Sequence, residues 1–266
     1  QSRLLNNLGL VAWRLDLYPQ AAEYYRQALE IAAAIDYPVG EANSLSNLGM
    51  VSARTGDYQH AAECCFAALD IVRKTGSRLV EANVLDNLGQ VMLGLGRHQQ
   101  AAEYYRQVIG LAREIGSRRA EADSLDGLGR VLRHQGQYEQ AADHHERALE
   151  LCRAVGRRRG EAVALNGLGE ALRAAGQRAQ ALARHDEALA VARQVNDRYQ
   201  QARAHAGLAG TYADAGDPGA AARPWQRAYA GFAELGVPEA DDIRARLEEL
   251  SVTGDGMQPD LDSTRP

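Results

Sequence analysis

The chain repeats itself at an interval of 40 residues, and this period constrains its fold more than any other feature. A Leu-Gly pair recurs along the chain and weakens to Leu-Ala in its last copy: Leu8-Gly9, Leu48-Gly49, Leu88-Gly89, Leu128-Gly129, Leu168-Gly169 and Leu208-Ala209. Self-similarity at a fixed interval of roughly 20 to 50 residues is typical of stacked arrays, in which each unit packs against its neighbours. The period therefore predicts a row of similar units.

A second set of small residues keeps the same interval, namely Ala21, Ala61, Ala101, Ala141, Ala181 and Ala221. Each is followed seven residues later by another alanine or by valine: Ala28, Ala68, Val108, Ala148, Ala188 and Ala228. Turn-forming residues separate the two phrases, as at Gly56 and Gly136, and others follow the second phrase, at Gly76, Gly116, Gly156, Asn196 and Gly236. Because such residues end helices, each unit is predicted to contain two helices and two turns.

The regular spacing of the turn-forming residues predicts six helix pairs. The expected helices lie near residues 2–15, 20–35, 39–55, 58–75, 79–95, 98–115, 119–135, 138–155, 159–175, 178–195, 199–215 and 218–235. We expect an array over residues 1–250, with units near 1–38, 39–78, 79–118, 119–158, 159–198 and 199–237. An amphipathic helix over 238–250 should cap the stack, and residues 251–266 contain too few apolar side chains to order and are expected to form a disordered tail.

Small residues explain how two helices can approach each other closely. In the first helix of the third unit, Ala82, Leu85, Leu88, Gly89 and Val91 recur at spacings that place them on one buried face. Ala101 should face them from the second helix. A leucine at the equivalent Gly129 is therefore expected to overpack the interface and to cost about 1–3 kcal/mol.

The composition is that of an ordinary globular protein, with 45% hydrophobic residues, 24% charged residues and a formal net charge of -5. This charge argues against a nucleic-acid-binding domain, which is usually basic. No apolar run is long enough for a membrane span, and residues 1–7 lack the apolar core of a signal peptide, so a cytoplasmic location is expected. Lys74 is the only lysine, and this bias toward arginine, alanine and glycine suggests a GC-rich bacterial genome. Because the chain begins within a repeat phrase, it is expected to be a piece of a longer protein.

The repeated phrases resemble the tetratricopeptide repeat. Leu8-Gly9, Ala21, Tyr25 and Ala28 match the family's Leu-Gly, alanine, aromatic and alanine positions. The chain departs from the family pattern in four ways. Leucine replaces the family's tryptophan at Leu5, Leu45, Leu85, Leu125 and Leu165, and the family's tyrosine is present only as Tyr212. The closing proline is missing, and the unit has 40 residues instead of about 34. Such units are similar to those of Pins/LGN adaptors, kinesin light chains and the C-terminal regions of SARP-type and NB-ARC-type bacterial transcription regulators. The resemblance implies an all-α, right-handed α-solenoid.

Residues of the first helices that lie outside the buried stripe should line the concave groove of such an array. The groove is expected to be apolar and amide-rich early and charged late, with these candidate binding residues: Leu10, Trp13, Asn43, Met50, Arg54, Asn83, Asp86, Asp126, Arg130, Arg133 and Arg173. Apolar side chains of a ligand would lie on the early part, and its carboxylates would meet the late arginines. Alternatively, the early apolar strip is exposed because a preceding unit or domain is missing.

Asn7, Asn47 and Asn87 precede the Leu-Gly pairs and should stack one unit apart. In the peptide-binding arrays that this chain resembles, asparagines at the matching position hold the ligand backbone, which implies the same role here. Alternatively, the three amides bridge neighbouring helices. Gly127, Gly167 and Gly207 replace them in later units. Family members that bind chaperone C-termini carry basic residues where this chain has Asn83 and Asn87, so such a ligand is not expected.

Other chemistry-bearing residues have structural explanations. His145 and His185 occupy the position that Tyr25, Tyr105 and Trp225 fill in other units, so packing explains these histidines better than metal binding does. The same explanation is preferred for His144 and for the Cys64-Cys65 pair. The turn arginines Arg78, Arg118, Arg119, Arg157, Arg158, Arg159 and Arg198 form either a basic edge or solvated ion pairs. No catalytic motif, metal motif or cofactor motif is present, so neither an enzyme nor a cofactor is expected.

The sequence thus predicts a non-enzymatic scaffold that binds a protein or peptide segment. By resemblance, we expect the sensory or regulatory region of a multidomain bacterial transcription regulator, whose groove could also hold another domain of the same parent chain. A free-standing adaptor and a peptide-pheromone receptor are the alternatives. No direct contact with nucleic acid or membrane is expected.

Overall fold

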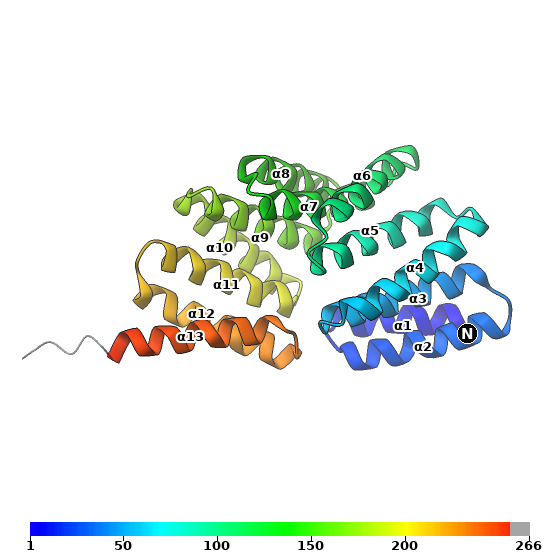
Figure 1. The fold of residues 1–266 in the computed structure, drawn as a ribbon, viewed down its shortest axis with the longest axis horizontal. Coiled ribbons are helices and arrows are strands. Elements are labelled where there is room, and N and C mark those ends of the chain that lie inside the picture. Colours follow the sequence, from blue (N-terminus) through cyan, green and yellow to red (C-terminus); the bar gives the residue numbers. More distant parts are fainter. Residues whose placement is uncertain (256–266) are drawn as a thin grey trace, which may run out of the picture.

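The computed structural model describes residues 1–255, and these residues form helices joined by short turns, with no strand among them (Figure 1). In chain order the helices are α1 (Ser2–Arg14), α2 (Tyr18–Ala34), α3 (Pro38–Arg54), α4 (Tyr58–Thr75), α5 (Arg78–Gly94), α6 (His98–Glu114), α7 (Arg118–His134), α8 (Tyr138–Ala154), α9 (Arg158–Ala174), α10 (Arg178–Gln194), α11 (Arg198–Asp214), α12 (Pro218–Leu235) and α13 (Glu239–Asp255). The all-α fold of six helix pairs and a further C-terminal helix is confirmed.

The turns repeat more regularly than the helices. A residue with positive φ stands every 20 residues, at Asp16, Asp36, Gly56, Gly76, Gly96, Gly116, Gly136, Gly156, Gly176, Asn196, Gly216 and Gly236. Glycine fills most of these positions because the left-handed region costs it nothing, and Asp and Asn tolerate that region better than other side chains. Side chains of Asp57, Ser117, Asp197 and Asp217 then accept the backbone N–H three residues ahead and begin the next helix.

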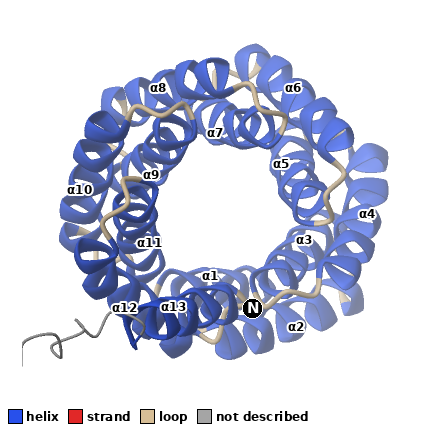
Figure 2. Ribbon diagram, turned by 60° about the vertical axis from the view of Figure 1, so that its left-hand side comes forward, coloured by secondary structure: helices blue, strands red, loops and turns tan. Residues whose placement is uncertain are grey.

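The helix pairs curve into a ring. The odd-numbered helices α1 to α11 form the inner wall and the even-numbered helices lie outside them (Figure 2). Each first helix contacts its partner and, from α3 onward, the second helix of the preceding unit, while α13 packs on α12. The predicted stripe of α5 is buried, with Leu88 and Val91 wholly inaccessible. Tertiary packing of these faces stabilises helices that would be marginal alone.

Glycines on the first helices enclose a ring side chain from the second helix. Tyr105 of α6 lies between Gly89 and Gly127, and a Cβ on these two glycines would come within 2.7 Å and 2.3 Å of the ring. His145 lies in the same way between Gly129 and Gly167, and His185 between Gly169 and Gly207. Both histidine side chains are fully buried, so they are packing residues. We call this arrangement of one ring and two glycines the ring clasp.

The two ends of the array meet. The guanidinium of Arg54, at the end of α3, lies 3.9 Å from the centroid of the Tyr199 ring and 5.5 Å from that of Trp13. Arg159 donates to the backbone carbonyl of Arg14 (2.8 Å) and forms an ion pair with Asp197 (2.9 Å). We call this contact between the first two units and the last two units the seam. A single apolar cluster contains residues from both ends of the chain.

Two boundaries differ from the expectation or lie beyond the structure. Helix α13 continues to Asp255, so residues 251–255 are helical where a disordered tail was expected. The remainder of the expected tail, 256–266, lies outside the described residues. Ile243 is buried and Leu247 half-buried in the α13 stripe, as a capping helix requires. None of the helices in residues 1–255 combines the length and the apolar character needed to cross a membrane.

Candidate functional site

The inner wall is the surface where the sequence places its candidate binding residues, and in the middle units its carboxylates are already engaged. Asp86 of α5 accepts from the Ser124 hydroxyl (2.7 Å) and from the Gln90 amide (3.0 Å). Burial raises the pKa of the Asp86 carboxyl to about 6, and the nearby Asp123 acts in the same direction. Asp126 pairs with the buried His145 (Nδ1 to Oδ1, 2.8 Å). Asp86 therefore joins the third unit to the fourth, and Asp126 joins the two helices of the fourth unit.

Two of the three arginines predicted for the late part of the wall are paired as well. Glu170 of α9 lies 2.7 Å from the Nε of Arg203 and 3.5 Å from the Nη2 of Arg133. Burial alone would raise the pKa of Glu170, but the two guanidiniums hold it far below its usual value. Arg173 lies 3.7 Å from Asp214. The pairing of Glu170 with two arginines was missed by the sequence analysis, although the 33-residue and 37-residue spacings place all three residues on successive first helices.

Arg130 differs from its neighbours on α7. It is half-buried and, within the described residues, forms no hydrogen bond or ion pair. The hydroxyl of Tyr105 is nearby, fully buried and without a hydrogen-bond partner. Burial raises the pKa of Tyr105, and the charge of Arg130 opposes that shift, which places the cation close to the phenol. Arg130 is the predicted arginine that remains available to a ligand carboxylate.

The asparagine ladder bridges units. The Nδ2 of Asn47 donates to the Oδ1 of Asn6 (2.8 Å), and the Nδ2 of Asn87 donates to the Oγ of Ser46 (2.8 Å). Asn7 is exposed and makes neither kind of bond. The alternative of helix bridging therefore describes Asn47 and Asn87. Their Oδ1 atoms remain without a partner in the described structure and can still accept an N–H.

The predicted binding residues of α1, α3 and α5, which form the early part of the wall, lie partly on open surface and partly in the seam. Leu10 is exposed, and Asn43, Met50 and Asn83 are half-buried or exposed, as expected for a surface that meets a ligand. Trp13 and Arg54 instead pack in the seam, where Trp13 also contacts Tyr18 at 5.3 Å between ring centroids. The guanidinium of Arg54, which the sequence places on the binding surface, is covered by two aromatic rings.

The comparisons with known proteins agree with this architecture. The model of the tetratricopeptide repeat matches residues 1–64, 40–114, 118–194 and 160–234. The chain belongs to the tetratricopeptide repeat family. Arrays of this family are a scaffold class, and no curated protein matches the sequence.

Solved tetratricopeptide structures share the fold at low sequence identity. A Rap protein complexed with Competence and Sporulation Factor has a TM-score of 0.72 at 14% identity, covering 97% of this chain and 76% of that one. The Rap conjugation gene regulator of plasmid pLS20, in complex with the Phr* peptide, has a TM-score of 0.68 at 16% identity, covering 97% and 75%. The STAND protein PH0952 from Pyrococcus horikoshii, which has a tetratricopeptide repeat sensor, has a TM-score of 0.61 at 14% identity, covering 95% and 42%.

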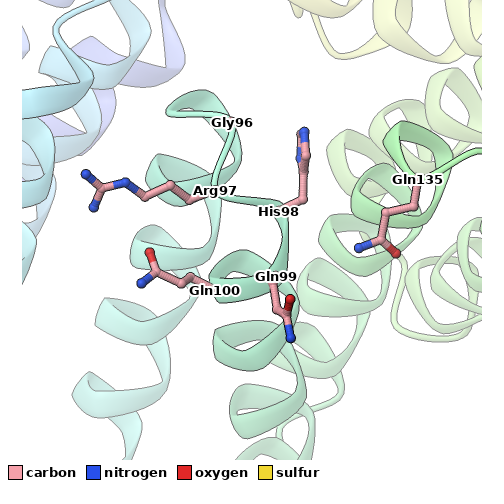
Figure 3. Close-up of a pocket in the computed structure, with 6 residues that line it drawn as sticks. All are labelled: Gly96, Arg97, His98, Gln99, Gln100 and Gln135. Carbon is pink, nitrogen blue, oxygen red and sulfur yellow. The ribbon is translucent and has the colours of Figure 1, made fainter.

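Other polar surfaces of the tetratricopeptide array offer weaker sites. A depression near the α5–α6 turn is lined by Gly96, Arg97, His98, Gln99, Gln100 and Gln135 (Figure 3). Arg97 points away from His98 and Gln135, so the polar groups do not converge (Figure 3). Among the turn arginines, Arg78, Arg119, Arg157, Arg158, Arg159 and Arg198 each pair with a carboxylate. The predicted basic edge is thus largely neutralised.

Acid is expected to destabilise the array through its buried histidines. Burial lowers the pKa of His185 to about 4, and the pKa values of His134 and His205 also fall to about 4. Since histidine in an unfolded chain titrates near 6.5, the neutral rings stabilise the fold fully above about pH 6.5, and this contribution is lost as the pH falls toward 4. The raised pKa of Asp86 has the opposite effect on the free energy of unfolding: stability rises as the pH falls from about 6 toward the pKa of an unfolded aspartate.

We therefore expect the free energy of unfolding to fall between pH 7 and pH 4.5, with His185 contributing about 1–2 kcal/mol of the loss. Urea unfolding at several pH values measures this slope. His185→Gln should flatten it, whereas the exposed Gln99 of α6 serves as a control because Gln99→Ala removes no titratable group and should leave the slope unchanged. An equal slope in all three proteins would contradict the assignment.

Proposed function

We propose that this chain binds an extended peptide or protein segment along its inner wall. The observation that carries the proposal is the unpaired Arg130, which lies on a wall whose other arginines are engaged. A half-buried guanidinium without an ion pair favours a carboxylate, because the local dielectric strengthens a charge-assisted hydrogen bond. Arg130 is therefore assigned to an acidic side chain or terminal carboxylate of the ligand.

The early wall supplies the remaining contacts. Leu10 and Met50 offer apolar surface, and methionine adapts to different side chains. The Oδ1 atoms of Asn47 and Asn87 accept backbone N–H groups of the ligand while their Nδ2 atoms hold the units together. Asn7, Asn43 and Asn83 extend the amide surface. The remaining charged residues of the wall stabilise it through their hydrogen bonds and ion pairs, namely Asp86, Asp126, Arg133 and Arg173.

The biological setting proposed is the sensory or regulatory region of a multidomain bacterial transcription regulator in the cytoplasm. Two structural neighbours are Rap proteins in complex with a factor or peptide, and a third is a STAND protein with a repeat sensor. Their low identity supports the fold alone, so the regulator role rests on resemblance. A free-standing adaptor or peptide-pheromone receptor is the alternative, and the domains encoded beside this segment distinguish the two. A non-enzymatic role fits either setting.

Selection from a displayed library of random peptides against the whole chain tests the binding proposal. Enriched peptides should carry an acidic residue or a free carboxyl terminus, and Arg130→Gln should weaken their binding about tenfold or more. Arg106→Gln is the matched control, because Arg106 is exposed on the outer helix α6. Peptides that bind the Arg130→Gln variant as tightly as the parent chain would overturn the role of Arg130. Failure to enrich any peptide would contradict peptide binding.

A further inference from the structure

The inner wall between α5 and α7 carries three carboxylates. The two helices lie side by side on the inner side of the ring (Figure 2). Asp86 belongs to α5, and Asp123 and Asp126 belong to α7. Burial raises the pKa of the Asp86 carboxyl to about 6, and the negative charges of Asp123 and Asp126 act in the same direction. The three carboxylates therefore lie close together, and this part of the wall favours a positive charge.

The Tyr105 hydroxyl is an independent indication that a group is missing here. The ring passes between Gly89 of α5 and Gly127 of α7, so the hydroxyl emerges between the helices that carry the carboxylates. Burial raises the pKa of Tyr105, and the charges of all three carboxylates add to that shift, which places the hydroxyl among them. The side chain is fully buried, yet its oxygen has no hydrogen-bond partner in the described structure. Because buried polar groups are normally paired, this oxygen points to a partner that the chain does not supply.

Acceptor sites remain free around this hydroxyl. Asp126 binds the His145 ring through Oδ1, and its Oδ2 makes no hydrogen bond within residues 1–255. The two oxygens of Asp86 accept from Ser124 and Gln90, and each oxygen has a second lone pair. Ionised carboxylates only accept hydrogen bonds, and a phenol oxygen can accept one as well. The missing group must therefore be a donor.

Arg130 balances only part of the negative charge. It lies near the same hydroxyl but forms no ion pair with any of the three carboxylates in the described structure. Asp123 is paired with Arg157 at 2.5 Å, so Asp86 and Asp126 share the single charge of Arg130. One further positive charge would balance the group.

The shape of the site favours a guanidinium over a compact cation. No three carboxylate, histidine or thiol groups of residues 1–255 converge closely enough to hold a metal ion. An ammonium also directs its donors from a single atom. A guanidinium presents five N–H groups in a planar fork, so it can reach acceptors that stand on two different helices.

We propose that the inner wall between α5 and α7 binds a guanidinium group, as carried by an arginine side chain. The carboxylates of Asp86 and Asp126 accept its N–H groups, and the Tyr105 hydroxyl accepts a further one. The site goes beyond the proposed function, because a single amino-acid derivative is enough to test it and the role of Arg130 does not enter.

Titration of N-acetyl-arginine amide into the whole chain, followed by NMR chemical shifts, tests the proposal. We expect binding in the millimolar range, as is usual for one side chain, and no measurable binding of the uncharged N-acetyl-citrulline amide. N-acetyl-lysine amide should bind about fivefold more weakly than the arginine probe. Asp86→Asn should weaken binding of the arginine probe about tenfold or more, and Tyr105→Phe about threefold.

Asp70→Asn and Tyr104→Phe are the matched controls and should bind like the parent chain. Asp70 is exposed on the outer helix α4, and Tyr104 adjoins Tyr105 but makes no hydrogen bond in the described structure. Tyr105→Phe should not lower the urea midpoint, since the hydroxyl that it removes has no partner within the described residues. Weaker binding by this variant would thus reflect the site and not unfolding.

Three results would overturn the guanidinium site. They are no binding at about 100 mM probe, equal binding of the citrulline or lysine probe, and parent-like binding by Asp86→Asn or Tyr105→Phe. Binding of the arginine probe by a chain that enriches no peptide would support this site and contradict the proposed function alone.

Discussion

Replacing Gly127 with asparagine is expected to lower the free energy of unfolding by about 3 kcal/mol. A Cβ at this position would lie 2.3 Å from both Cε1 and Cζ of Tyr105. The Tyr105 ring cannot swing away, because it is fully buried and Gly89 confines it from the other side. Either the ring must leave its rotamer or α7 must separate from α6, and both changes cost packing energy. Urea unfolding monitored by circular dichroism measures the loss.

Gly110 provides the control for this substitution. It lies within α6, and a Cβ there would meet no atom within 4 Å, so Gly110→Asn should change stability by less than about 0.5 kcal/mol. The contact between units two and three suggests a second substitution that should restore stability. There, Asn87 stands at the position of Gly127, and the small Cys65 stands at the position of Tyr105. Tyr105→Cys combined with Gly127→Asn should cost less than the sum of the two single changes. Strict additivity would show that the ring clasp does not couple the two sites.

Replacing Arg54 with alanine should open the seam. Its guanidinium stacks between the rings of Tyr199 and Trp13, and desolvated contacts of this kind contribute about 2 kcal/mol. We expect a comparable loss in the free energy of unfolding, together with a larger radius of gyration in small-angle X-ray scattering. The scattering change follows because the seam is the contact that joins the first two units to the last two units.

Arg3→Ala separates the seam from the general effect of losing an arginine. Arg3 stacks on Tyr37 at 5.3 Å, but both residues belong to the first unit and lie outside the seam. This variant should retain the radius of gyration of the parent chain and lose less than about 1 kcal/mol. If Arg54→Ala kept the parent's dimensions, the rest of the seam would be sufficient to close the ring.

Most of the fold follows from local sequence patterns. The 40-residue period and its turn residues predict the helix pairs within a few residues, because each helix is fixed by its own apolar stripe and by its immediate neighbours. The sequence also indicates that Gly127, Gly167 and Gly207 replace asparagine. The structure shows that each of these glycines admits the ring of the preceding unit, whereas Tyr25 fills the ring position of the first unit with Asn47 in the unit that follows.

The candidate site was less predictable. Sequence periodicity places Arg130, Arg133 and Arg173 on the same wall, but it does not reveal that Glu170 and Asp214 pair with two of them. The seam has no sequence pattern at all, since it joins residues such as Arg54 and Tyr199 that lie far apart in the chain. Its formation depends on the accumulated curvature of all the units, and a small rotation per unit would separate its residues.

The seam also limits how such a chain can evolve. An open row of units can gain or lose a member with little penalty, because each unit touches only its neighbours. Here, removing one 40-residue unit from the middle would carry Tyr199 away from Arg54 and Arg159 away from Arg14. Selection on closure therefore acts on the number of copies in the gene, and a duplication or deletion that keeps every helix intact would still disrupt the protein.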